Sequence, residues 1–95
     1  MKHLPEEIEI KILWRMFRHH FIGGKHTSID NLKKGFEKSV YGDVDMAIDN
    51  LIKQGFIVMK PTSYGKQVSL NPKMLDIAKQ KIGDFNPSSS QSNQS

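Results

Sequence analysis

The chain has 95 residues, no cysteine and a formal net charge of +4. A chain this short builds one modest core and hardly a deep substrate cleft as well, which predicts a single domain that is not an enzyme. The lack of cysteine excludes disulfides, thiolate nucleophiles and cysteine-ligated zinc, and no apolar run is long enough for a membrane span or a signal peptide. We therefore expect a cytoplasmic protein without a membrane partner, whose positive charge favours an anionic one.

The first predicted element is a helix over residues 5–21, before a pair of glycines. Pro5 suits the first helical position because its ring fixes φ, and Glu6 and Glu7 suit the positive end of the helix dipole. The large apolar side chains of one face, expected in the core, are Ile10, Leu13, Trp14, Phe17 and Phe21. A second, narrower apolar strip consists of Ile8, Ile12 and Met16. This strip is a candidate interaction surface, because either the last helix of the chain or a second copy of the protein must cover it.

A second helix is predicted over residues 28–37, capped by Thr27 or Ser28 and preceded by a very short strand at residues 25–27. Its buried face consists of Ile29, Leu32 and Phe36. The two lysines that point away from this face are Lys33 and Lys34. We expect them to face an anionic partner.

A third helix over residues 43–54 is followed directly by a hairpin. The single apolar stripe of this helix consists of Val44, Ala47, Ile48, Leu51 and Ile52. Gly55 ends the helix, because glycine adopts the left-handed backbone of a C-terminal cap without strain. The hairpin strands are predicted at residues 56–60 and 67–70, joined by a turn around Tyr64.

Two blocks of sequence carry a family resemblance: AIDNLIKQGFI at residues 47–57 and KPTSYGKQVSLNP at residues 60–72. Their order, helix, glycine, strand, turn and strand, resembles the recognition helix and wing of winged helix-turn-helix domains. The second block resembles one in short archaeal winged-helix proteins of unassigned role. The resemblance implies an α+β fold with a three-helix core and a small β-hairpin wing. It also implies that the third helix enters a DNA groove while the hairpin tip contacts the flanking backbone.

A fourth helix is predicted over residues 72–82, with Asn71 as N-cap and Pro72 at the first helical position. The winged-helix domain then spans residues 1–83. Residues 84–95 lack the apolar side chains that could offset the entropy of ordering them, and are predicted to form a disordered polar tail. The side chains expected to be most buried in the domain are Trp14, Phe17, Phe36, Leu51 and Phe56.

The sequence predicts neither a metal site nor a cofactor. His19 and His20 are adjacent, so on a helix their side chains diverge by roughly 100° instead of converging on one ion. The chain has no nucleophile elbow, no glycine-rich phosphate loop and no pair of carboxylates in an apolar frame. We therefore expect no catalytic residues.

The charge is unevenly distributed along the chain. Residues 40–55 carry one lysine and three aspartates, whereas residues 56–83 carry five lysines and one aspartate. The candidate nucleic-acid-binding residues are Lys33, Lys34, Asn50, Lys53, Lys60, Tyr64 and Lys66. Amide and ammonium groups can read bases or bind phosphates, but carboxylates on the third helix are repelled by the phosphates that line a groove. This distribution favours contacts with the DNA backbone through the hairpin and the basic helix faces.

Three functions follow from these patterns, in this order. The first is a module that binds double-stranded DNA, in a small transcriptional regulator or a chromosome-associated protein. The alternative is a protein-interaction module or homodimer. It uses either the apolar strip of Ile8, Ile12 and Met16 on the first helix or the outer face of the third helix. The residues proposed on that outer face are Asp45, Met46 and Asp49. The third is RNA binding through the basic faces.

Overall fold

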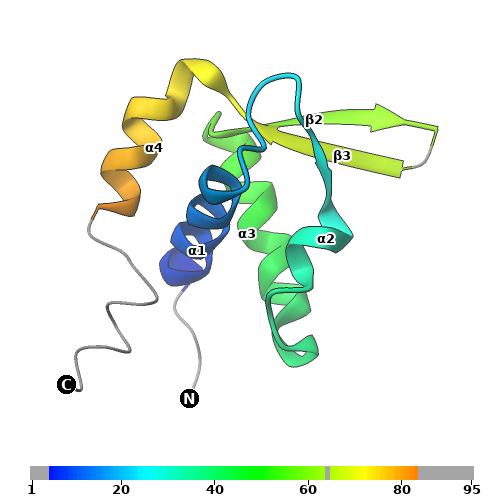
Figure 1. Ribbon diagram of the computed structural model, residues 1–95. Helices are drawn as coiled ribbons and strands as arrows, with labels where there is room; N and C mark the ends of the chain where they lie inside the picture. Colours follow the sequence, from blue (N-terminus) through cyan, green and yellow to red (C-terminus); the bar gives the residue numbers. More distant parts are fainter. Residues whose placement is uncertain (1–4, 64, 84–95) are drawn as a thin grey trace.

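The computed structural model describes residues 5–63 and 65–83. Within these residues the chain has an α+β architecture of four α-helices and a three-stranded antiparallel sheet (Figure 1). The elements in chain order are α1 (Pro5–Arg18), β1 (Thr27–Ser28), α2 (Ile29–Lys33), the 3-10 turn η1 (Lys38–Val40), α3 (Tyr41–Lys53), β2 (Ile57–Thr62), β3 (Gly65–Leu70), the 3-10 turn η2 (Pro72–Met74) and α4 (Leu75–Ile82). This arrangement is compatible with a winged-helix layout. The predicted tail, residues 84–95, lies outside the described residues.

The sheet has the strand order β1-β3-β2, with β3 in the centre. Thr27 of β1, Val68 of β3 and Met59 of β2 lie side by side in register. Because side chains alternate along a strand, these residues share one face of the sheet. Val68 and Leu70 are fully buried on that face, so the base of the hairpin joins the core. The rest of the hairpin extends beyond the helices (Figure 1).

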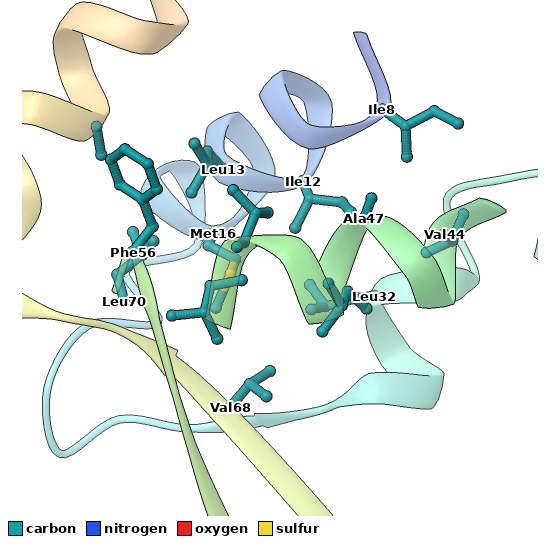
Figure 2. Close-up of a cluster of buried hydrophobic side chains, with 14 residues drawn as sticks. Ile8, Ile12, Leu13, Met16, Leu32, Val44, Ala47, Phe56, Val68 and Leu70 are labelled. Atoms are coloured by element: carbon teal, nitrogen blue, oxygen red, sulfur yellow. The ribbon is translucent and has the colours of Figure 1, made fainter. Parts of the chain in front are cut away.

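The core lies mainly between α1 and α3, which pack against each other. In Figure 2, Ile12 of α1 lies next to Ala47 of α3. The buried residues of α1 are Ile8, Ile12, Leu13 and Met16, with Glu9 beside them. The strip of Ile8, Ile12 and Met16 is therefore covered within the domain, and the prediction that a second copy of the protein covers it is wrong. The strip belongs to the core face of α1, which packs against α3 and also contacts α4, and it offers no interaction surface.

The five side chains expected to be most buried belong to two groups. Leu51 and Phe56 are buried, as predicted, but Trp14, Phe17 and Phe36 are only half-buried. A cation lies over each of the three half-buried rings, in the pairs Arg18 with Trp14, Lys79 with Phe17 and Lys11 with Phe36. The observed core face of α1 differs from the predicted one by a rotation around the helix axis. The largest side chains lie on the flank of α1, and the smaller aliphatic side chains face the core.

Helix α1 ends at Arg18 and not near residue 21, because His20 adopts the left-handed conformation with φ of 58°. The His20 N–H donates to the Phe17 carbonyl (3.1 Å) and the Phe21 N–H to the Met16 carbonyl (2.9 Å). This pair of bonds is the Schellman cap. The helix therefore ends at a histidine, before the glycine pair. A prediction that uses glycine as the capping residue could not locate this end.

The other boundaries differ from the predictions by a few residues. Helix α2 ends at Lys33 and not at residue 37, because the next residues form turns in which Gly35 and Phe36 donate to carbonyls three residues back. Helix α3 begins at Tyr41 directly after η1, two residues earlier than predicted. The first part of the predicted fourth helix is the 3-10 turn η2, whose N-cap is Asn71 as expected. Both hairpin strands extend closer to the turn than predicted.

Candidate nucleic-acid interface

Helix α3 has an apolar side in the core and a polar side in solvent. The buried residues are Val44, Ala47, Ile48 and Leu51. The residues predicted to point outward, all exposed, are Asp45, Met46, Asp49, Asn50 and Lys53. Met46 is 65% exposed, which is a large apolar exposure for a helix of this size. The outward side of α3 therefore combines carboxylates with one exposed methionine.

Lys33 pairs with Asp45 instead of pointing freely into solvent. Its Nζ lies 2.8 Å from Oδ1 of Asp45 and 5.6 Å from the centroid of the Tyr41 ring. The bond from the Asp45 carboxylate raises the pKa of the Lys33 ammonium above its ordinary value. The pair joins α2 to the first turns of α3 and removes Lys33 from the set of free cations. It also neutralises one of the carboxylates that would repel phosphate.

The cap of α2 fixes where Lys33 lies. The Ser28 side chain accepts from the Asn31 N–H (3.0 Å), and the Asn31 amide donates to the Thr27 hydroxyl (2.8 Å). Ser28 is therefore the N-cap, and Asn31 links the helix to β1. Tyr41 and Asp45 are four residues apart on α3, so they share one face that meets Lys33. That spacing was the available signal for the Lys33 pair, and sequence reasoning missed it.

The two hairpin lysines are exposed but lie on opposite faces of the hairpin. Lys60 pairs in register with Gln67, and Lys66 with Pro61. Because Lys60 and Pro61 are adjacent on one strand, their side chains point in opposite directions. A rigid duplex that lies against one face of the hairpin thus meets one of these lysines directly. Tyr64, the third predicted hairpin contact, lies outside the described residues.

Lys66 lies beside the start of α2. A hollow of about 270 Å³ is lined by Ser28, Ile29, Asp30, Gly65 and Lys66. The hairpin and the start of α2 thus border one hollow on the Lys66 face. Lys34, at the C-cap of α2, is exposed as predicted.

Asn50 and Lys53 are three residues apart and exposed on the same side of α3. Within the described residues the ion pairs are Lys33 with Asp45 and Lys81 with Glu9, and neither involves Asp49 or Lys53. Lys53 therefore remains a cation without a carboxylate partner in that part of the chain. It lies on an otherwise acidic helix.

Residues 5–63 and 65–83 lack two further features. None of their helices is both long and apolar enough to cross a membrane. No group of three or more histidine, aspartate or glutamate side chains among them could hold a metal ion.

No protein-family model matches this chain, and neither the curated proteins nor the solved structures compared with it give a significant match.

Proposed function

We propose that this chain is a winged helix-turn-helix module that binds double-stranded DNA, in a small transcriptional regulator or a chromosome-associated protein. The chain order supports this fold, because a helix, a short strand, two helices and a hairpin occur in the sequence that winged-helix domains use. The strand order β1-β3-β2 also supports it, since the central strand of the sheet is the returning strand of the hairpin.

The mode of contact that we propose uses the hairpin and the basic end of α2, with α3 held outside the groove. One observation carries this choice: the charge of α3 and the charge of the hairpin are opposite. The outward side of α3 exposes Asp43 and Asp49 besides the paired Asp45, whereas Lys60 and Lys66 have no carboxylate partner within the described residues. Phosphates attract the hairpin lysines and repel α3.

The titration that tests this function uses a labelled duplex of random sequence and fluorescence anisotropy. Each ammonium–phosphate contact contributes roughly −0.9 to the slope of log affinity against log salt. Lys34 and one or two hairpin lysines therefore predict a slope of about −1.8 to −2.7 between about 50 and 200 mM salt. Absence of binding at the lower salt concentration would contradict the proposal. Tighter binding of single-stranded RNA than of duplex DNA would favour the third function.

A second function is favoured by Met46. This side chain is 65% exposed, and Asp43 and Asp49 lie three residues before and after it on the same side of α3. Exposed methionine is adaptable and common at protein-binding surfaces. An acidic helix with an exposed methionine fits a basic partner protein that offers a small apolar pocket. Replacement of Met46 by Lys should abolish such a complex and leave duplex binding unchanged or stronger.

A further inference from the structure

A small cavity lies between α1 and the turn after α2, away from the hairpin. Its volume is about 60 Å³, and its lining residues are Lys11, Trp14, Arg15, Gly35 and Phe36. A cavity needs roughly 10 to 15 Å³ of such space to hold one water, so this one admits a small group of a few atoms. The DNA-binding proposal uses none of these residues.

Arg15, which lines this cavity, has a donor without an acceptor. Its Nε is buried and has no hydrogen-bond partner among the residues that the structure describes. The guanidinium lies closely against Gly35, since a Cβ added there would be 2.5 Å from Nη1 of Arg15. A buried polar group that lacks its bond is unfavourable, and more so when it is charged. The guanidinium is thus held in place by packing while part of its binding capacity is unused.

Two more cations lie near this cavity: Lys11 lines it, and Arg18 contacts the ring of Trp14, which also lines it. Lys11 is one turn before Arg15 on α1, and its Nζ lies 5.4 Å from the centroid of the Phe36 ring. The Arg18 Cζ lies 5.4 Å from the centroid of the Trp14 ring. The two ion pairs recorded in the described part of the chain involve none of these three cations. Like charges one turn apart repel each other, so a bound anion would relieve this repulsion.

We propose that this cavity binds the carboxylate of a ligand whose body is flat and apolar. The planar guanidinium fork matches the two oxygens of a carboxylate, and the cavity is large enough for that group alone. The Trp14 and Phe36 rings at the wall favour a flat aromatic body over an aliphatic one. Two sources share this chemistry: a free aromatic acid, and the terminal carboxylate of a peptide that ends in an aromatic residue. The inference is independent of DNA binding.

Trp14 is the only tryptophan of the chain, so its fluorescence reports on this cavity directly. Titration with benzoate at constant ionic strength should give a saturable change in the millimolar range, which is typical of a ligand of this size. Benzamide has the same shape without the charge, and should bind at least about tenfold more weakly. N-acetylphenylalanine is the probe for a peptide terminus. Whichever of the two acids binds more tightly identifies the source.

Three variants test the residues. Arg15→Gln should weaken benzoate binding by about tenfold or more, and Lys11→Gln by about threefold. Gly35→Ala keeps every charge but pushes the guanidinium aside, so it should weaken binding as Arg15→Gln does. Lys73→Gln is the control, because Lys73 is exposed on η2 and does not line the cavity. Circular dichroism checks that each variant is folded, and Lys11→Gln remains a test if Arg15→Gln does not fold.

Four results would overturn the proposal. They are the absence of saturation with both acids, an equal response to benzamide, unchanged affinity in folded Lys11→Gln and Gly35→Ala, and tighter binding of inorganic phosphate than of benzoate. The last result would make the cavity a phosphate site.

Discussion

Helix α3 and the β2–β3 hairpin are consecutive in the chain and differ in how each is held in place. Helix α3 buries one whole side against α1, and its outward side is acidic. The hairpin buries only its base, and its outer half is held by strand pairing and exposes two lysines. Packing and the proposed DNA contact are thus separated: α3 stabilises the domain, and the outer hairpin is the part that we propose to contact DNA. Substitutions in α3 should change stability, and substitutions in the outer hairpin should change affinity.

The largest expected effect is on the buried side of α3. Leu51 is fully buried, so Leu51→Ala should lower the free energy of unfolding by about 2 to 5 kcal/mol. Val58 on β2 is 47% exposed, and Val58→Ala should cost less than about 0.5 kcal/mol. Urea unfolding followed by circular dichroism measures both. Similar losses in the two variants would break the distinction between α3 and the hairpin.

The next effect concerns the joint between the two regions. Gly55 ends α3 with φ of +89°, and an added Cβ would touch nothing within 4 Å. Gly55→Ala should therefore cost about 1 to 2 kcal/mol from backbone strain alone. Gly42, in the first turn of the same helix, also has free space around a Cβ and no positive φ. Gly42→Ala should stabilise the domain by about 0.5 to 1 kcal/mol, because alanine is the better helix former. Changes of the same sign in the free energy of unfolding of both variants would contradict this account of the joint.

The smallest effect extends the comparison to the end of α1. His20 closes α1 with the same pair of bonds that Gly55 makes for α3, but histidine is strained at a φ of 58°. His20→Gly should raise the free energy of unfolding by about 0.5 kcal/mol, a balance of relieved strain and added chain entropy. His19→Gly, one residue earlier and without positive φ, is the control and should destabilise. Thermal unfolding separates the two; a loss in both variants would show that His20 is not strained.

The sequence predicted most elements of the fold because their signals are local. The apolar stripe of α3, Gly55 and the alternation of β3 each depend on nearby residues alone. The core face of α1 could not be predicted in this way, since two apolar strips competed. The size of the side chains favours one strip as the core face, whereas α3 packs against the other strip, which has smaller aliphatic side chains. Periodicity predicts that a helix has an apolar face, but it does not predict which neighbouring element covers that face.

The candidate site was harder to predict than the fold. Exposure of Lys34, Asn50 and Lys53 was predictable from helical spacing. The bond between Lys33 and Asp45 joins two elements, and the opposite faces of Lys60 and Lys66 depend on the hairpin register. A shift of register by one residue reverses every face, and the sequence around the turn does not fix the register.

The most direct test compares the salt dependence of duplex binding in a hairpin variant and an α3 variant. Lys60→Ala with Lys66→Ala should flatten the slope of log affinity against log salt by about one to two units, with Lys66 contributing at least as much as Lys60. Asp49→Asn is the matched α3 variant, because Asp45→Asn would also release Lys33. We expect Asp49→Asn to leave both the slope and the affinity nearly unchanged. An unchanged slope in the folded lysine variant, together with stronger binding by Asp49→Asn, would show that α3 enters the groove and would contradict the account.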